Sequence, residues 1–172
     1  MIGKYLVKLK TKFALKRNDA IRISDGFQNA KKIGVIYTQS VDLDMEVVNE
    51  FIKKLESAGK TVQTITFISK VKKTDSFDFP FFTENDFSAN GKWRKPEVEN
   101  FKKEAFDYLI SLDQETNKYT RNILASSKAK CRVGKFEEGF DQYFELMIDH
   151  SDNNFEAFID QLFHYLKSVR NG

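Results

Sequence analysis

A strand, helix and strand pattern between Phe106 and Phe136 constrains the fold of this chain more than any other feature. Residues 108–112 form a short apolar run that favours β-structure, and the polar stretch 113–117 ends that run and can cap a helix. We expect the helix to reach about Lys128, with the basic residues around its end suiting a helix C-terminus, and a strand to follow at 131–133. Such units build parallel sheets, whose ligands bind beyond the carboxyl ends of the strands.

The rest of the chain repeats this alternation of short apolar runs and helical periodicity. We expect a strand at 33–37, a helix from Met45 that stops at Gly59, a strand at 61–68, a helix starting at Pro96, a strand at 143–148 and a helix from Asn153 or Asn154 to about Val169. Residues 81–87 are expected to form an extra strand or an aromatic-anchored loop. The predicted fold is a doubly wound α/β structure with a mostly parallel sheet of about five strands and helices on both faces.

Length and composition predict a single globular domain over residues 1–172, with a Rossmann-like core at 31–169. A chain of 172 residues can bury roughly 70% of the surface that its unfolded form exposes. Cys131 is the only cysteine, so we expect no disulfide partner, no multi-cysteine metal site and a reducing compartment. The sequence has no long apolar run and no signal-peptide pattern, so we predict a cytoplasmic protein. If its basic N-terminal segment binds lipid, the protein would be peripheral on the inner membrane face.

Residues 1–17 predict a basic amphipathic helix that is appended to the core. Its expected apolar face carries Ile2, Leu6, Leu9 and Phe13. Its cations, which precede the first acidic residue of the chain, are Lys4, Lys8, Lys10, Lys12, Lys16 and Arg17. Such a helix can bind an anionic membrane surface or RNA phosphates. Two alternatives need no partner: the apolar face packs on the protein's own sheet, or the cations attract the acidic final quarter of the chain.

Acidic residues and a histidine follow the predicted strands and can face one crevice. The candidate ligand-binding residues are Asp42, Asp44, Asp113, Glu115 and His150. Grouped carboxylates could bind Mg²⁺, and His150 could act as a general base, with Asp113 the other catalytic candidate. We favour the simpler interpretation that these Asp residues cap helices, and we expect no metal and no cofactor. The loop 37–41 lacks the glycines of a dinucleotide site.

Three short segments also carry a resemblance. Residues 109–113, Leu-Ile-Ser-Leu-Asp, and 132–134, Arg-Val-Gly, resemble the N-terminal Rossmann-like half of heptosyltransferase-type GT-B glycosyltransferases. Those transferases use a second nucleotide-fold domain for the activated sugar, for which this length leaves no room, so we expect no active transferase. The whole chain is similar to a family of small uncharacterised bacterial proteins, with the Lys-Cys-Arg-Val-Gly-Lys segment at 130–135 and a terminal FIDQLFHYL-like helix. That resemblance implies no activity.

These observations predict a non-enzymatic cytoplasmic binding or scaffold module whose N-terminal helix contacts an anionic partner. Binding of a protein partner, which the sequence does not identify, is a further alternative. The alternative is a sugar or nucleotide-sugar enzyme that uses the acidic edge of the sheet. A smaller basic aromatic segment surrounds Trp93. We expect Trp93 to anchor a surface loop, with base stacking as the alternative.

Overall fold

The computed structural model describes residues 2–23, 26–40, 43–71, 76–152 and 154–170, with side chains described from residue 5 onward. Its centre is a six-stranded sheet in which every neighbouring pair is parallel. The spatial order is β3-β2-β1-β4-β5-β6. The strands are β1 (Lys32–Gln39), β2 (Thr61–Ile68), β3 (Phe81–Phe82), β4 (Tyr108–Ser111), β5 (Cys131–Lys135) and β6 (Leu146–Ile148).

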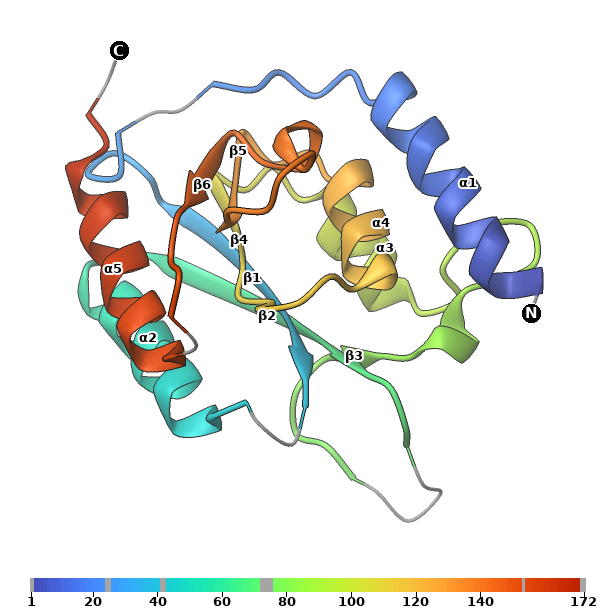
Figure 1. Ribbon diagram of the computed structural model, residues 1–172, viewed down its shortest axis with the longest axis horizontal. Coiled ribbons are helices and arrows are strands. Elements are labelled where there is room, and N and C mark those ends of the chain that lie inside the picture. The colour runs from blue at the N-terminus through green and yellow to red at the C-terminus, as the bar shows by residue number, and fades with distance from the viewer. Residues whose placement is uncertain (1, 24–25, 41–42, 72–75, 153, 171–172) are drawn as a thin grey trace.

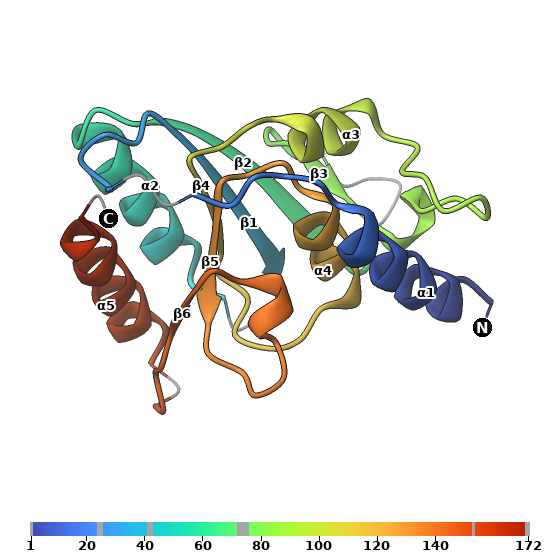
Figure 2. The same ribbon diagram turned by 90° about the horizontal axis from the view of Figure 1, so that it is seen from above.

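Helices cover both faces of this sheet, as the two views in Figures 1 and 2 show. The helices are α1 (Ile2–Arg17), α2 (Met45–Ser57), α3 (Pro96–Lys103), α4 (Lys118–Ser126) and α5 (Phe155–Ser168). Helices α2 and α5 pack on one face, and α3 and α4 pack on the other, with α1 lying along α4. The predicted doubly wound α/β fold is therefore confirmed, with six strands in place of about five.

Alternation along the strands divides the apolar core between these two faces. In β1, Val35 packs toward α2 and α5, while Ile36 packs toward α3 and α4. Because successive side chains of a strand point to opposite faces, one apolar run supplies both halves of the core. Gly34 allows β1 a close approach, since a Cβ there would lie 2.8 Å from the ring of buried Phe106.

Polar side chains set the helix starts where the sequence indicated. Asp44 caps α2 by accepting hydrogen bonds from the amides of Glu46 and Val47, and Asn117 and Asn154 cap α4 and α5. Asn153, the other predicted cap, lies outside the described residues. These caps satisfy amides that have no partner inside the helix.

Two predicted boundaries are wrong. Helix α4 ends at Ser126, before Lys128 and Lys130, whose amines form ion pairs with Asp19 and Asp107 and do not lie on the last helical turn. Strand β6 begins at Leu146, and not at 143, because the preceding residues have other contacts: 141–143 form a 3₁₀ turn and Glu145 binds Arg132. Residues 81–87, predicted to be an extra strand or an aromatic-anchored loop, form the two-residue β3, a 3₁₀ turn at Glu84–Asp86 and a bridge between Phe87 and Trp93.

Helix α1 is docked through a different face from the one predicted. Its buried residues are Val7 and Thr11, whereas Leu9 and Phe13 remain exposed. The Thr11 hydroxyl lies 3.1 Å from the side-chain amide of Asn122 on α4, which donates to it. The amide of Asn122 also accepts a hydrogen bond of 3.0 Å from the indole of Trp93. A buried polar pair thus selects the docked face of α1.

The segment after α1 ties the helix to the core. Asn18 donates from its side-chain amide to the carbonyl oxygens of Ala125 and Ser127 at the end of α4, each at 2.8 Å. Arg22 donates to the carbonyls of Ser127 and Ala129. Orphan carbonyls at the C-terminus of α4 are satisfied in this way, and α1 is held in place beyond its own contacts.

Candidate functional site

The carboxyl ends of the central strands border a cleft at the point where the strand order reverses. Strand β1 lies between β2 and β4. The chain adds β2 and β3 on one side of β1, and then β4, β5 and β6 on the other side. Parallel sheets bind ligands at such a position. A cavity of about 990 Å³ lies here, and a second of about 380 Å³ shares part of its wall. We call this pair the switch-point cleft; residues 113–117 and Lys135 line both cavities.

Asp113, the residue after β4 and Leu112, forms a bridge between two walls of the cleft. One carboxylate oxygen accepts a 2.6 Å hydrogen bond from the backbone amide of Thr38 at the end of β1, and the other accepts one of 2.6 Å from the hydroxyl of Thr120 on α4. Burial raises the pKa of Asp113 above its usual value, and the hydrogen bonds from Thr38 and Thr120 oppose that rise. The favoured role of Asp113 as a helix cap is therefore wrong, because Asn117 caps α4; the carboxyl of Asp113 joins β1 to α4 instead.

Asn117 adds a second bridge across the same gap. Its side-chain nitrogen donates to the hydroxyl of Thr38 at 2.7 Å, while its side-chain oxygen accepts from the amide of Tyr119 at 2.9 Å. The cap of α4 is thus also a link to β1. Together Asp113 and Asn117 hold the floor of the cleft in one geometry, and the N-terminus of α4 with its partial positive charge borders the cavity.

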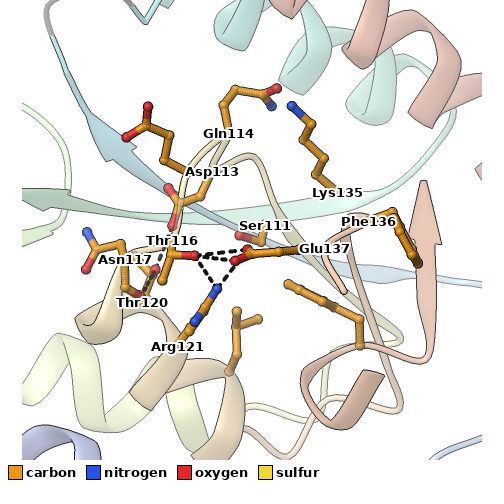
Figure 3. Close-up of a pocket in the computed structure, with 13 residues that line it drawn as sticks. Ser111, Asp113, Gln114, Thr116, Asn117, Thr120, Arg121, Lys135, Phe136 and Glu137 are labelled. Carbon is orange, nitrogen blue, oxygen red and sulfur yellow. Dashed lines mark hydrogen bonds and ion pairs between the residues drawn. The ribbon is translucent and has the colours of Figure 1, made fainter. Parts of the chain in front are cut away.

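An ion pair in the wall of the smaller cavity joins α4 to the loop that follows β5 (Figure 3). The guanidinium of Arg121 donates to Glu137 at 2.8 Å, and the hydroxyl of Thr116 donates to the same carboxylate at 2.7 Å. The Arg121 guanidinium also stacks 3.3 Å from the centre of the Phe140 ring. Burial lowers the pKa of Arg121 while Glu137 raises it, and the guanidinium stays charged. The charges of this wall are neutralised internally.

Tyr119 forms part of an apolar wall with a polar tip. Its ring stacks on Phe67 with 5.0 Å between ring centres, and its hydroxyl donates to Glu84 at 3.0 Å. Burial, together with the Glu84 carboxylate, raises the pKa of Tyr119 to about 12. The phenol therefore remains protonated at neutral pH and cannot serve there as a base.

Lysines from distant parts of the chain line the larger cavity. They are Lys8 of α1, Lys70 after β2, Lys118 of α4 and Lys135 of β5. Lys8, Lys70 and Lys135 form no ion pair within the described residues, whereas the amine of Lys118 lies 4.9 Å from the ring centre of Tyr119. Hydroxyl groups of Ser40, Ser69 and Thr116 complete a cationic, hydrogen-bonding lining.

Two of the other predicted site residues, Asp44 and His150, lie apart from Asp113. Asp44 is committed to the cap of α2, and Asp42 lies outside the described residues. His150 follows β6, where its ring nitrogens face Gln161 at 2.8 Å and the carbonyl of Asn154 at 3.1 Å. It does not line either cavity of the switch-point cleft. Of the predicted ligand-binding residues that the structure describes, Asp113 and Glu115 line the cleft, and Lys8 of the predicted anion-contacting cations lines its larger cavity. No group of three metal-ligating side chains occurs among the described residues.

Helix α1 exposes a second surface of interest on the side away from α4. Tyr5, Leu9 and Phe13, spaced four residues apart, are 77%, 51% and 47% exposed. The cations beside them are Lys8, Lys12, Lys16 and Arg17, and each is exposed. The side chain of Lys4 lies outside the described part of the chain. Helix α5, which carries Glu156 and Asp160 of the acidic final quarter, lies at the opposite end of the molecule in both views, so these two carboxylates do not neutralise this basic surface (Figures 1 and 2).

Sequence reasoning placed no lysine in the cleft, and it predicted Lys8 only as an anion-contacting residue of the N-terminal helix. Lys70 and Lys135 could have been found, because residues at the carboxyl ends of parallel strands border one edge of the sheet. Lys8 could not, since its place depends on how α1 docks. Trp93 was predicted to anchor a loop, and this is confirmed: the side chain is 4% exposed and packs against Phe82 and Phe87.

None of the helices in the described part of the chain combines enough length with enough apolar character to cross a bilayer. The model of a family of unknown function, DUF6913, matches residues 4–169, and the chain belongs to that family. A comparison with curated proteins found no match. The match begins within α1 and covers every later element up to and including α5, and it assigns neither activity nor ligand. The finer resemblance to a glycosyltransferase half stays a prediction.

Proposed function

We propose that this member of the family of unknown function is a non-enzymatic binding module that attaches to an anionic membrane surface, such as the cytoplasmic leaflet, through helix α1. The observation that carries this proposal is the exposed face of α1 formed by Tyr5, Leu9 and Phe13 with lysines along its side. Helices of this kind lie in the plane of the lipid interface, with apolar side chains among the acyl chains and cations near the headgroups.

The docking of α1 leaves that face available. The helix uses Val7 and Thr11 to bind α4, and this docked side is opposite to Leu9 on a helix with 3.6 residues per turn. A helix that only completed the core would be expected to turn its largest apolar residues inward. Here Leu9 and Phe13 are 51% and 47% exposed, whereas the buried residues of the helix are Val7 and Thr11.

The charge of α1 complements an anionic surface. Residues 2–17 contain six cations and no carboxylate, as the sequence IGKYLVKLKTKFALKR shows. Each lysine near an anionic leaflet contributes about 1 kcal/mol, and complete burial of a Leu or Phe side chain contributes about 1.5–3 kcal/mol. Half-exposed Leu9 and Phe13 can supply roughly half of that each. The sum suits reversible, salt-sensitive attachment.

A membrane surface accounts for more of the structure than RNA does. Phosphate groups need only the cations, and they leave the exposure of Leu9 and Phe13 without a role. Base stacking on Trp93 is not available, because that ring is 4% exposed and its indole nitrogen is bound to Asn122.

Liposome sedimentation tests the proposal without deleting α1, whose removal would uncover the apolar core beneath it. The double variant Leu9→Gln and Phe13→Gln should lose binding to vesicles that contain anionic lipid, while Tyr165→Gln, a change of an exposed aromatic on α5, should not. Lys12→Gln with Lys16→Gln should weaken binding, and Lys53→Gln on α2 should leave it unchanged. Equal recovery of the wild type and the Leu9/Phe13 variant would exclude membrane attachment.

The same proteins distinguish RNA as the partner. If RNA is the target, the Leu9/Phe13 variant will still bind it, and only the lysine changes and added salt will reduce affinity. That outcome would replace the membrane proposal. Retention on vesicles of neutral lipid alone, undiminished by the lysine changes, would also contradict the assigned role of the cations.

A further inference from the structure

We propose that the switch-point cleft binds a phosphorylated, hydroxyl-rich small molecule, such as a sugar phosphate or a nucleotide, with Lys70 and Lys135 as phosphate ligands. This inference goes beyond membrane attachment and does not depend on it. It rests on the size of the cleft, on the lysines that line it and on the way its carboxylates are already engaged.

The dimensions of the cleft suit a small molecule. The larger cavity of about 990 Å³ and the adjoining one of about 380 Å³ fall within or near the range of known ligand sites. The floor is formed by the ends of β1 and β4, where Asp113 and Asn117 hold Thr38 in place. A site that is built before the ligand arrives loses little entropy on binding.

The charges that remain available in the cleft are mostly positive. Lys8, Lys70 and Lys135 reach the larger cavity from three separate elements and have no ion pair within the described residues. Figure 3 shows the side chain of Lys135 extending toward Gln114 across the cleft. Each of these three lysines brings a positive charge that is not paired with a carboxylate of the described residues, so an anion in the cavity is attracted to the lysines that it approaches.

The carboxylates that line the cleft have partners within the protein. Asp113 accepts hydrogen bonds from Thr38 and Thr120. Glu84 accepts from Tyr119, and Glu137 binds Arg121. Glu115 is exposed at the rim, and among the described lining carboxylates it has no such partner. The local field therefore favours an anionic ligand over a cation.

Neutral groups define the rest of the ligand. The hydroxyls of Ser40 and Ser69 and the amide of Gln114 line the cavity and can bind the hydroxyls of a sugar. Phe67 and Tyr119 supply a stacked apolar wall. The N-terminus of α4 adds partial positive charge toward the same space. Phosphate on a polyhydroxylated body is the chemistry that uses all of these features.

Isothermal titration calorimetry on the full chain tests the proposal with pyrophosphate, glucose 6-phosphate and ADP as probes. At least one of the three should bind saturably, and unphosphorylated glucose and adenosine should not. Lys70→Gln and Lys135→Gln should each raise the dissociation constant about tenfold, the usual effect of losing one charge-assisted contact. Lys53→Gln, which removes an exposed lysine from α2 outside the cleft, is the matched control, and Glu115→Gln should tighten binding.

These outcomes distinguish a specific phosphate site from a general attraction of anionic probes to a basic protein. Absence of saturable binding for all three probes would overturn the proposal, and so would equal losses in Lys70→Gln and Lys53→Gln. Lys8 is left unchanged because it belongs to α1. The ligand and liposome results therefore fail or succeed independently: loss of vesicle binding in the Leu9/Phe13 variant should leave probe binding intact.

Discussion

The buried contact between Thr11 and Asn122 gives the sharpest test of how α1 is held. The Thr11 hydroxyl donates to the carbonyl of Val7 at 2.7 Å and accepts from the Asn122 side-chain amide at 3.1 Å, while Asn122 accepts from Trp93. Thr11, Asn122 and Trp93 are 5%, 3% and 4% exposed, so water cannot replace a lost partner readily. The change Thr11→Val keeps the shape of the side chain and removes only the hydroxyl.

The expected cost follows from the group that is left behind. With valine at position 11, an N–H of Asn122 has no acceptor, and a buried unsatisfied donor costs about 1–3 kcal/mol. Asn122→Leu should cost a similar amount, because it strands the indole N–H of Trp93. In the Asn122→Leu background the hydroxyl of Thr11 no longer accepts a hydrogen bond from a side-chain amide. There, Thr11→Val should be nearly neutral, so the two changes couple by about 1–2 kcal/mol.

Urea unfolding measured by fluorescence provides the assay, since Trp93 is the only tryptophan and lies in the network itself. The four proteins of a double-mutant cycle give the coupling free energy directly. Thr64→Val, the same chemical change at a half-buried position of β2, controls for the loss of a hydroxyl as such. Costs that simply add in the double variant would refute the network as the device that orients α1.

Further predictions concern the core, the floor of the cleft and a buried arginine. Gly34→Ala should destabilise the fold by about 1–3 kcal/mol in denaturant unfolding, because the new Cβ meets the ring of Phe106; an unchanged midpoint would contradict this close approach. Burial raises the pKa of Asp113, so the folded state holds the proton of this carboxyl more tightly than the unfolded state does. The resulting contribution to folding stability is complete below the unfolded-state pKa and is lost as pH rises through the folded-state pKa. Melting temperature against pH should therefore fall less over that window in Asp113→Asn than in the wild type, and parallel curves would contradict the pKa direction. Glu145→Ala should lower the free energy of unfolding by about 3–5 kcal/mol in the same assay, because it leaves the guanidinium of Arg132, 2.6 Å away, buried without its carboxylate. A loss of less than about 1 kcal/mol, the value of a surface ion pair, would show that other groups hold Arg132.

Much of the fold could be predicted because local rules and tertiary structure agree. The strand at 61–68 was predicted with the bounds that it has, because its β-branched and aromatic residues favour a strand through their own propensity. Capping at Asp44 was predicted from the same chemistry that the structure uses. The late start of β6 was not, because Glu145 makes a long-range ion pair with Arg132 that no local pattern reveals.

The candidate site was predictable only in part. Asp113 and Glu115 were expected at the carboxyl edge, and both line the cleft. The role of Asp113 depends on Thr38, 75 residues earlier in the chain, because parallel strands bring their carboxyl ends together. His150 was expected at the same edge, yet β6 is the outermost strand and holds it beside α5, away from the crevice.

The sequence by itself determined the alternation of strands and helices, the parallel sheet and the basic character of residues 2–17, since these depend on composition and short-range periodicity. Only the tertiary structure decided which face of α1 is buried. Apolar spacing favoured Leu9 and Phe13, but the partner surface on α4 offers the amide of Asn122, which must be hydrogen-bonded when buried, and Thr11 meets that need. The largest apolar side chains of α1 are left outside for this reason, and the proposed membrane surface exists because of it.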